Sequence, residues 1–281
     1  MPDSAVYTCA AVAWKAGFRF YPLISTNDGS QRPIVVAIAV GLAESSCNPA
    51  AQNHNGPTSG CPNGSTDRGL WQINDCYHSE VSNACAYQVQ CNADAAWKIS
   101  SEGTNWTPWS TYNGGAWKSY ISDADSIING GFTITLQNHG TNTCLDADSS
   151  QARNGGLIFQ WACSSSDNYQ RWTVSDVSGH NPIIKNVGTG TCLDADSSKA
   201  GNGQPIFQWA CNSTADNYQE WWIEGSGQYN TNGQANAELQ NQGMYYAGHN
   251  ICLDADSSQA RNGGLIFQWT CSSGDTHQQW N

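Results

Sequence analysis

A glutamate at the end of an apolar segment is the strongest candidate for acid chemistry in this sequence. Residues 34–43 are apolar on nearly every side, and they follow Pro33, which suits the first turn of a helix. We therefore predict a buried helix that carries Glu44 at its C-terminal end. Apolar surroundings and the negative end of a helix dipole both disfavour a carboxylate, so we expect the pKa of Glu44 to be raised. A carboxyl group that stays protonated is suited to act as a general acid.

A further helix is predicted near the N-terminus. Apolar residues there fall at helical spacing, and the pattern ends before Pro22. We expect this amphipathic helix to pack in the core through Tyr7, Ala11, Trp14 and Phe18. Six cysteines in the same half of the chain are expected to form three disulfides, but their spacing does not choose among the many pairings: Cys9, Cys47, Cys61, Cys76, Cys85 and Cys91.

The stretch from Glu44 onward resembles the lysozyme superfamily. Glu44-Ser45 is followed by Ser65-Thr66-Asp67 and by a Gly-Leu-Trp-Gln-Ile-Asn run that ends at Asn74. The later segments 92–96 and 106–120 are similar to those of bacterial and phage lysozyme-like transglycosylase domains. The resemblance covers roughly residues 5–122 and implies a mainly α-helical catalytic domain.

This resemblance implies two catalytic carboxyl groups. Glu44 would protonate the glycosidic oxygen, and Asp67 would act as a nucleophile or stabilise an oxocarbenium ion. A pair is needed because one carboxyl group cannot be proton donor and anion at once. For Asp67 a structural role is an equally open interpretation, because residues 55–62 lengthen the connection between the two acids and Arg68 replaces an expected aromatic residue.

Candidates for substrate binding follow from the same resemblance. Gln72 and Asn74 could hydrogen-bond the sugar beside the scissile bond, and Trp109 and Tyr112 could line the cleft. Taken singly, such aromatic residues more often lie in a core. Other polar residues nearby are expected to be solvated or lack the spacing of a metal site, so we predict no metal and no cofactor: Asp75, Glu80, His54 and His78.

The C-terminal half of the sequence is a three-fold repeat. The segment Cys-Leu-Asp-Ala-Asp-Ser-Ser begins at Cys144, Cys192 and Cys252, and each copy continues to Ile-Phe-Gln-Trp and closes with Gln-x-Trp. The first cysteines are 48 and then 60 residues apart, so we predict an insertion in the last repeat near residues 229–236. A second cysteine follows the first by 19 residues in every copy, which predicts three disulfides: Cys144–Cys163, Cys192–Cys211 and Cys252–Cys271.

These repeats resemble the ricin-type β-trefoil lectin family. Short alternating strands and Gly, Asn and Ser turns in three copies predict an all-β unit with pseudo-three-fold symmetry. The Gln-x-Trp that ends each copy is the hallmark of that family, and the resemblance covers residues 132–281. We expect the motif glutamines and tryptophans to be core residues that fix each repeat: Trp172, Trp221 and Trp280.

The trefoil resemblance also implies glycan-binding residues. In each repeat an aspartate accepts hydrogen bonds from sugar hydroxyls and a tryptophan covers the apolar face of the sugar: Asp146, Asp194 and Asp254 with Trp161, Trp209 and Trp269. Further sugar-contacting positions hold Asn168 and Tyr169 in the first repeat and Asn217 and Tyr218 in the second. The third repeat has Thr276-His277 there, which puts its site in doubt. The competing interpretation is that these aspartates cap turns and these tryptophans lie in the core.

The composition argues against several classes of partner. The formal net charge is −12 with only 11 Lys and Arg residues, and no basic cluster could neutralise the phosphates of a nucleic acid. The longest apolar run, residues 34–43, is too short to insert into a bilayer. Twelve cysteines favour an oxidising compartment, and since residues 1–4 lack the features of a signal peptide, we expect a mature, secreted chain.

Together these features predict a multidomain fold. A mainly α lysozyme-like catalytic domain at residues 1–125 is followed by a linker at 126–131 and an all-β β-trefoil at 132–281. The predicted function is that of a secreted, monomeric glycosidase that cleaves between N-acetylmuramic acid and N-acetylglucosamine in peptidoglycan while the trefoil holds it on a glycan. Three alternatives stay open: a lytic transglycosylase, a chitin- or chitosan-cleaving enzyme, and a lectin whose lysozyme-like domain is inactive.

Overall fold

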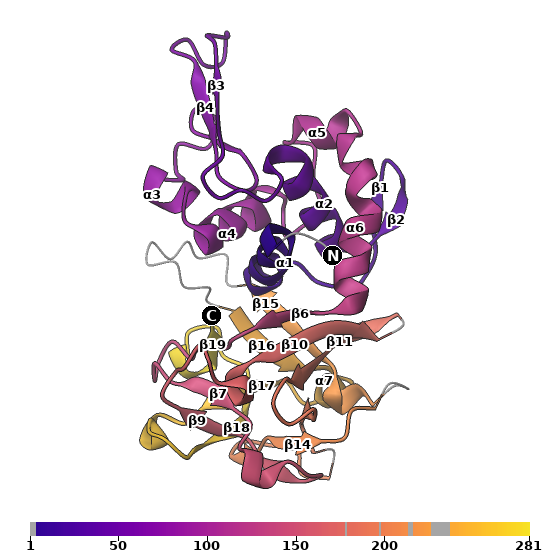
Figure 1. Ribbon diagram of the computed structural model, residues 1–281, viewed down its shortest axis with the longest axis vertical. Coiled ribbons are helices and arrows are strands. Elements are labelled where there is room, and N and C mark those ends of the chain that lie inside the picture. The colour runs from indigo at the N-terminus through magenta and orange to yellow at the C-terminus, as the bar shows by residue number, and fades with distance from the viewer. Residues whose placement is uncertain (1–3, 178, 197, 213–215, 226–236) are drawn as a thin grey trace. The chain divides into compact units, whose positions relative to one another are not determined.

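The computed structural model describes residues 4–177, 179–196, 198–212, 216–225 and 237–281. The chain divides into two compact units, and the division falls between Ile127 and Ile128. Figure 1 shows a helical unit, coloured indigo to magenta, and a β-rich unit whose colours continue to yellow. No helix within the described residues is both long and apolar enough to cross a membrane. The insertion predicted near residues 229–236 lies outside the described residues.

The N-terminal unit is mainly helical and also contains two small antiparallel sheets. One sheet pairs β1 (Ile24–Thr26) with β2 (Gly29–Gln31), and the other has the order β3 (Gln52–Asn55), β4 (Ser65–Arg68), β5 (Ile73–Asn74). Residues 126–130, predicted as part of a linker, lie in α6. The helices and the 3-10 turn η1 are α1 (Ser4–Ala16), α2 (Pro33–Ser45), α3 (Asn83–Ala86), α4 (Val89–Ile99), α5 (Ser110–Asn113), η1 (Ala116–Tyr120) and α6 (Ile121–Gly130).

Helix α2 is the buried helix that the sequence predicts. Its residues 33–42 are all apolar and all buried. Pro33 occupies the first turn, where the missing N–H would have no partner within the helix. The helix ends at Ser45, because Ser46 adopts the left-handed conformation with a φ of 55°. Glu44 therefore stands in the last turn, at the edge of the apolar core.

The first helix is present, but the buried face that we predicted for it is only partly right. Helix α1 ends at Ala16, and Tyr7 is 39% exposed, whereas Trp14 is fully buried. A disulfide joins Cys9, on the buried face of α1, to Cys47, just after α2. The buried side chains of α1 are Val6, Cys9, Ala10, Val12, Ala13, Trp14 and Ala16.

All twelve cysteines form disulfides. In the N-terminal unit the pairs are Cys9–Cys47, Cys61–Cys76 and Cys85–Cys91. The three pairs predicted for the repeats are confirmed: Cys144–Cys163, Cys192–Cys211 and Cys252–Cys271. Such a density of disulfides is typical of proteins that live in an oxidising compartment.

Helix α4 packs against α1 and buries a carboxyl group at the contact. Gln90 Nε2 donates to Asp94 Oδ1 at 2.9 Å and to the carbonyl of Val12 in α1 at 3.2 Å. Burial raises the pKa of Asp94 to about 7, and the hydrogen bond from Gln90 opposes this shift. The carboxyl group of Asp94 is therefore mostly protonated in mildly acidic solution.

We expect Asp94→Asn to stabilise the protein at high pH. The pKa of Asp94 is about 7 in the folded state, whereas its ordinary value is 3.8. The protonated group therefore contributes its full stabilisation below pH 3.8, and this stabilisation is lost as the pH rises to about 7. Asn keeps the shape and cannot ionise. Thermal unfolding should show a higher Tm for Asp94→Asn than for the parent at about pH 8, and similar Tm values at about pH 4. Equal Tm values at the higher pH would contradict this expectation.

The C-terminal unit is an all-β trefoil. One sheet has the order β6-β10-β11-β12-β14-β8; the other has the order β15-β16-β17-β18-β9-β7, with β13 paired to β18 and β19 to β16. Within the described residues, its strands and the helix α7 are β6 (Phe132–Ile134), β7 (Cys144–Asp146), β8 (Gly156–Leu157), β9 (Phe159–Trp161), β10 (Trp172–Val177), β11 (His180–Asn186), β12 (Cys192–Asp194), β13 (Gln204–Pro205), β14 (Phe207–Trp209), β15 (Trp221–Gly225), β16 (Ala237–Asn241), α7 (Gln242–Tyr246), β17 (Ile251–Ala255), β18 (Gly264–Thr270) and β19 (Gln279–Trp280).

Short 3-10 turns recur between these strands at equivalent places. They are η2 (Ser149–Gln151), η3 (Asn168–Gln170), η4 (Asn217–Gln219), η5 (Ser257–Gln259) and η6 (Thr276–Gln278). The Gln-x-Trp motifs lie in the core, as predicted. In every repeat the indole N–H of the motif tryptophan donates to a leucine carbonyl of that repeat at 3.0 Å: Trp172 to Leu145, Trp221 to Leu193 and Trp280 to Leu253.

Candidate active site and trefoil sites

The N-terminal unit contains a cleft of about 320 Å³ that brings together distant parts of the sequence. The last turn of α2, the sheet β3-β4-β5 and the segment that leads into α5 all contribute to it. Five of the six residues predicted for the catalytic site line this cleft, and Tyr112 does not. The lining residues are Glu44, Asn55, Asp67, Gln72, Ile73, Asn74, Tyr77, His78, Ile99, Pro108, Trp109 and Ser110.

Glu44 lines this cleft with a carboxyl group whose pKa is raised. Burial is the largest cause that raises the pKa of Glu44 above its ordinary value. Hydrogen bonds from Thr111 lower the pKa and the charge of Asp67 raises it further. The hydroxyl of Thr111 donates to Glu44 Oε1 at 2.5 Å. The expected direction of the shift is thus present in the structure.

Asp67 faces the same cleft from β4 and is held by asparagine amides. Antiparallel pairing sets Asp67 opposite Asn53 on β3 and opposite Asn74 on β5. Its Oδ1 accepts from Asn74 Nδ2 at 2.6 Å, and its Oδ2 accepts from Asn55 Nδ2 at 2.8 Å and from Asn53 Nδ2 at 3.5 Å. Three amide donors therefore match the acceptor oxygens of this carboxylate and fix its orientation.

The turn between β4 and β5 ties the sheet to α2. Trp71 in this turn is fully buried, and its indole N–H donates to the carbonyl of Ala37 in α2 at 2.9 Å. Ser45, the residue after Glu44, donates through Oγ to the carbonyl of Leu70 at 2.6 Å. These two hydrogen bonds fix the sheet relative to α2. Because Glu44 lies on α2 and Asp67 lies on the sheet, the same contacts position both carboxyl groups.

Asn92 of α4 shapes the same turn, and sequence reasoning missed its role. Gly69 has a φ of 74°, and a Cβ there would come within 2.1 Å of the carbonyl oxygen of Ala86, so the turn requires glycine. Asn92 is fully buried beside it. Its Oδ1 accepts from the backbone N–H of Trp71 at 2.9 Å, and its Nδ2 donates to the carbonyls of Ala86 and Arg68 at 2.7 and 3.1 Å.

Gln72 and Asn74, predicted to contact the sugar, have different surroundings in the cleft. Gln72 Nε2 donates to two backbone carbonyls at 2.8 and 3.1 Å, which leaves its Oε1 to accept from a ligand. Asn74 Nδ2 donates to Asp67 and to Ser65 Oγ, and its Oδ1 accepts from two backbone N–H groups. Asn74 therefore orients Asp67, and its contact with a sugar stays a prediction.

Of the two aromatic residues predicted to line the cleft, only Trp109 does so. Trp109 lines the cleft, and its indole N–H is fixed by the carbonyl of Trp71 at 2.8 Å. Tyr112 is buried because α5 turns it toward η1, where its ring stacks on Trp117 with a centroid distance of 5.2 Å. The structure thus gives Tyr112 a packing role.

Residues between β5 and α3 add groups that sequence reasoning did not assign. Tyr77 and His78 line the cleft, and His78 Nδ1 lies 3.3 Å from Glu80 Oε1. Asp75 accepts from the backbone N–H of Thr66 at 2.8 Å and is not among the lining residues. The sequence spacing of Tyr77 and His78 does not predict a place in the cleft. They follow directly after Cys76, which the disulfide to Cys61 fixes in position.

Each trefoil repeat presents one exposed tryptophan next to a buried aspartate. Trp161, Trp209 and Trp269 are 40, 39 and 42% exposed, whereas Asp146, Asp194 and Asp254 are buried. Burial raises the pKa of all three aspartates, and a hydrogen bond from the motif glutamine lowers it in each repeat. The exposed rings favour a ligand platform over a core role, since every Gln-x-Trp tryptophan is buried.

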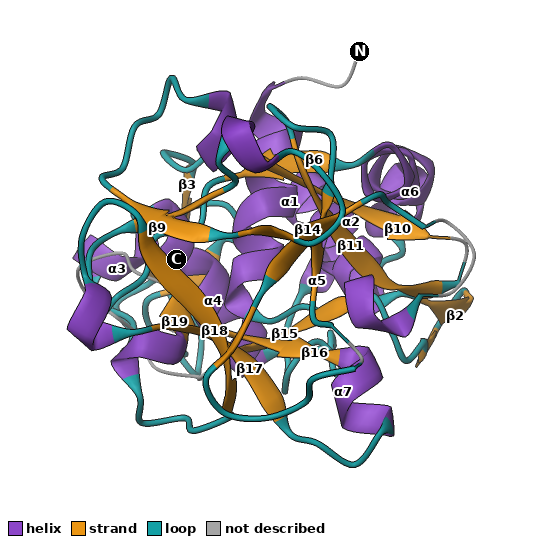
Figure 2. Cartoon of the chain, turned by 90° about the horizontal axis from the view of Figure 1, so that it is seen from below, coloured by secondary structure: helices purple, strands orange, loops and turns teal. Residues whose placement is uncertain are grey.

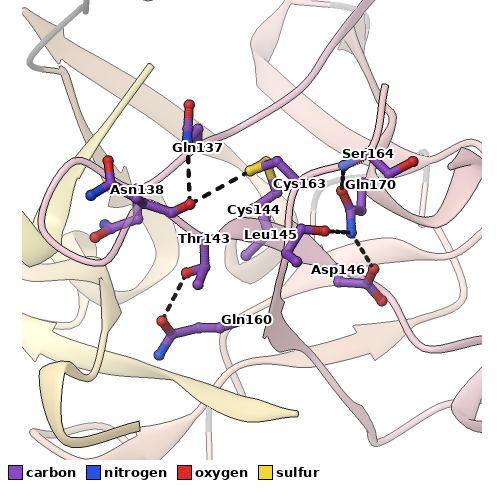
Figure 3. The surroundings of a disulfide bond; sticks show 12 residues. Gln137, Asn138, Thr143, Cys144, Leu145, Asp146, Gln160, Cys163, Ser164 and Gln170 are labelled. Atoms are coloured by element: carbon purple, nitrogen blue, oxygen red, sulfur yellow. Dashed lines mark hydrogen bonds between the residues drawn. A yellow bond between two sulfur atoms is a disulfide. The ribbon is translucent and has the colours of Figure 1, made fainter. Parts of the chain in front are cut away.

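The motif glutamine orients the aspartate. In Figure 3 Gln170 lies between Ser164 and Asp146, close to the disulfide Cys144–Cys163. Its Nε2 donates to Asp146 Oδ2 at 3.1 Å, and its Oε1 accepts from the backbone N–H of Ser164 at 2.7 Å. In the second repeat Gln219 donates to Asp194 Oδ2 at 3.0 Å in the same way. One oxygen of each aspartate is thus fixed by the fold.

The ring before each motif glutamine lies against a glycine. A Cβ on the glycine would come within 2.6 Å of a ring carbon in every repeat, at Gly188 for Tyr169, Gly243 for Tyr218 and Gly140 for His277. Asn168 and Asn217 begin the 3-10 turns η3 and η4 that carry the two tyrosines. The three repeats therefore hold this ring in the same position, whether it is tyrosine or histidine.

The third repeat, doubtful from its sequence, has a well-formed hollow. Its volume is about 260 Å³, and Asp254 and Trp269 line it together with His277. His277 Nδ1 lies 2.9 Å from Asp275 Oδ1, which also lines the hollow. The third repeat thus has histidine where the others have tyrosine, and Asp254 and Trp269 still line one hollow.

We expect glycan binding at the second repeat to weaken as the pH falls through about 6. Burial raises the pKa of Asp194 to about 6, and only the ionised carboxylate accepts hydrogen bonds through both oxygens. A variant with Asp146→Asn and Asp254→Asn keeps only this one of the three repeated sites, and adding Asp194→Asn gives the reference from which the effect is measured. Titration calorimetry with a soluble glycan at several pH values measures it. An affinity that stays constant well below pH 6 would contradict the expectation.

The fold and the two kinds of site define a carbohydrate-active, glycan-binding protein. A family model described as a ricin-type beta-trefoil lectin domain matches residues 132–280, and one described as a lysozyme like domain matches residues 24–111. The chain belongs to the ricin-type β-trefoil lectin family, with a lysozyme-like domain preceding the lectin domain. No curated protein matches the chain.

Several solved structures are similar to about half of this chain. A designed 3-fold symmetric protein, ThreeFoil, is 19% identical with a TM-score of 0.44, covering 53% of this chain and 96% of its own. A ricin B-like lectin from Macrolepiota procera, in complex with lactose, is 18% identical with a TM-score of 0.41, covering 54% and 94%. A mosquitocidal holotoxin is 18% identical with a TM-score of 0.43, covering 53% and 17%.

Proposed function

We propose that the chain is a secreted glycosidase that cleaves peptidoglycan between N-acetylmuramic acid and N-acetylglucosamine while its trefoil binds glycan. The observation that carries the proposal is Glu44, an acid with a raised pKa that shares one cleft with Asp67. A lysozyme-like domain supports glycosidase or transglycosylase activity. Six disulfides support secretion, because they persist in oxidising surroundings.

In this proposal Glu44 is the general acid. Its Oε2 donates a proton to the glycosidic oxygen, the bond from that oxygen to C1 breaks, and positive charge develops on the sugar ring. Asp67 stabilises this charge, either as an ion pair or by attacking C1. Water then completes the hydrolysis, and Glu44 takes up one of its protons. The hydrogen bond from Thr111 to Glu44 Oε1 orients the acid throughout.

A lytic transglycosylase is the second candidate. In that reaction the 6-hydroxyl of the sugar attacks C1 in place of water, and Glu44 alone is sufficient. The three asparagine amides that orient Asp67 favour hydrolysis. A reaction through Glu44 alone would not need an oriented carboxylate at Asp67. Mass spectrometry of digested peptidoglycan separates the two, since hydrolysis leaves a reducing end and transglycosylation gives an anhydro product lighter by one water.

The same digest tests the wider proposal. Release of disaccharide fragments from purified peptidoglycan supports it. Cleavage of N-acetylglucosamine or glucosamine oligomers without cleavage of peptidoglycan would favour a chitin- or chitosan-cleaving enzyme instead. Binding to glycans with no cleavage of any of these substrates would favour a lectin with an inactive lysozyme-like domain.

We expect the trefoil, rather than charge, to hold the enzyme on an insoluble wall. The net charge of −12 repels an anionic wall, although salt screens this repulsion beyond about 8 Å. Removing the three carboxylates through Asp146→Asn, Asp194→Asn and Asp254→Asn should lower the rate on insoluble peptidoglycan, relative to soluble fragments, by about tenfold or more. Clearing of a turbid suspension and product release from soluble fragments provide the ratio. A ratio equal to that of the parent would contradict this role.

A further inference from the structure

The third repeat departs from the other two in the connection between β16 and β17. An equivalent asparagine begins this connection in all repeats, since Asn138, Asn186 and Asn241 each donate through Nδ2 to the backbone carbonyl of the middle residue of a Gln-x-Trp motif. The first cysteine of the repeat follows six residues after Asn138 and Asn186 but eleven residues after Asn241. The longer connection begins with α7, which is drawn in purple at the end of β16 in Figure 2.

This longer connection brings two tyrosines to a tryptophan that the first repeat lacks. Trp222 follows the motif tryptophan of the second repeat, where the first repeat has Thr173. The ring centroids of Trp222 and Tyr245 are 5.0 Å apart, and those of Tyr245 and Tyr246 are 6.0 Å apart. Tyr245 and Tyr246 are 51 and 66% exposed. Two departures from the repeat thus meet in one exposed aromatic cluster, formed by Trp222, Tyr245 and Tyr246.

A hollow with polar walls adjoins the aromatic cluster. Its volume is about 220 Å³. The indole N–H of Trp222 donates to Gln240 Oε1, and Gln240 Nε2 donates to Asn250 Oδ1, so Gln240 joins the cluster to the hollow. Strand pairing sets Trp222 opposite Gln240 and, two residues further on the same face, Glu224 opposite Glu238. The hollow is lined by Glu224, Glu238, Gln240, Asn250, Cys252 and Cys271.

We propose that the aromatic cluster and this hollow form a further glycan-binding site, separate from the three repeated sites. The proposal rests on the same pairing of groups as in the repeats, where an exposed aromatic ring adjoins acidic acceptors. The tyrosine rings would cover the apolar face of a sugar, and Glu238, Gln240 and Asn250 would bind its hydroxyls. Two glutamates, with no Lys or Arg among the residues that line the hollow, select neutral glycans over acidic ones.

The test uses the full chain in a background that silences the repeated sites. Asp146→Asn, Asp194→Asn and Asp254→Asn remove their carboxylates, and an array of neutral and acidic oligosaccharides is the probe. Residual binding to neutral glycans is expected in this background. Adding Tyr245→Ser and Tyr246→Ser should lower it about tenfold, and Trp222→Thr, which restores the residue of the first repeat, should lower it in the same direction.

Val187→Ser is the matched control. Val187 is 41% exposed and lies in the equivalent connection of the second repeat, so its replacement should leave the residual binding unchanged. Loss of all binding in the background variant would overturn the proposal, and so would residual binding whose strength the aromatic substitutions leave unchanged. Hydrogen exchange gives a second readout in the same background. Residues 237–252 should be protected by a bound neutral glycan, and exchange that the glycan leaves unchanged there would also overturn the proposal.

Discussion

Glu44→Gln should lower the rate of glycan cleavage by about 10²–10⁴-fold, the range expected when a general acid is removed. Gln has nearly the shape of Glu and can still accept the hydrogen bond from Thr111, but it has no proton to give to the glycosidic oxygen. The fold should therefore persist, and the Tm should stay close to that of the parent. Initial rates on soluble peptidoglycan fragments, together with thermal unfolding, check both expectations.

Glu80→Gln is the control for this substitution. Glu80 is a carboxyl group on the surface next to the cleft, where it contacts His78. Its replacement should change the rate only slightly. Undiminished cleavage by Glu44→Gln would show that another group is the acid, and the proposed mechanism would then fail.

The pH profile gives a second view of Glu44. The acid must be protonated to act, so the rate should fall as the pH rises through the pKa of Glu44. Since burial and the charge of Asp67 both raise that pKa, the falling limb should lie above the range of an ordinary glutamate. Replacing Asp67 with a neutral residue should move this limb to lower pH, because it removes one cause of the shift.

Asp67→Asn should lower the rate by about 10²-fold or more, the effect of losing one preorganised charge next to the reacting carbon. An amide cannot stabilise the positive sugar ring or attack it. It also offers only one acceptor oxygen to the three asparagine donors, so a modest loss of stability should accompany the loss of rate. Rates and Tm values measured side by side separate the two effects.

Asp75→Asn is the matched control for Asp67→Asn. Asp75 accepts from the backbone N–H of Thr66, which the amide oxygen of Asn can still do, so the rate should stay near that of the parent. If Asp67→Asn cleaves as fast as the parent, the carboxylate is not part of the reaction. An anhydro product in that case would assign the chemistry to Glu44 alone.

Several features of this protein can be predicted because their signal is local and repeated. The spacing of 19 residues predicts each repeat disulfide, since the same spacing recurs in all three copies. Helix α2 is predictable because a segment that is apolar on every side can only be buried, and this also places Glu44 at its end. The platform tryptophans and their aspartates are predicted from the resemblance of the repeats to the ricin-type trefoil family, and the three tryptophans are exposed in the structure.

The roles of other residues depend on which segments of the chain contact one another. The sequence of one segment does not predict those contacts. The apolar pattern of α1 places Tyr7 on the buried face, but Tyr7 is 39% exposed, and Cys9 is buried in a disulfide with Cys47. Asn74 was predicted to bind sugar, and strand register also sets its side chain against Asp67. Tyr112 was predicted to line the cleft, but α5 turns it toward Trp117. In each case a partner distant in sequence decides the role of the residue.

The sequence by itself thus determined the three-fold repeat, its three disulfides and the buried helix that ends beside Glu44, because apolar pattern and fixed period act within a short stretch of chain. The lysozyme-like domain was predicted from its resemblance to a known superfamily. Only the tertiary structure decided that Asn53, Asn55 and Asn74 surround Asp67. It also decided that Trp222 meets Tyr245 next to a hollow. These contacts depend on strand register and on the direction that each turn gives the chain, and register follows from the packing of the whole unit.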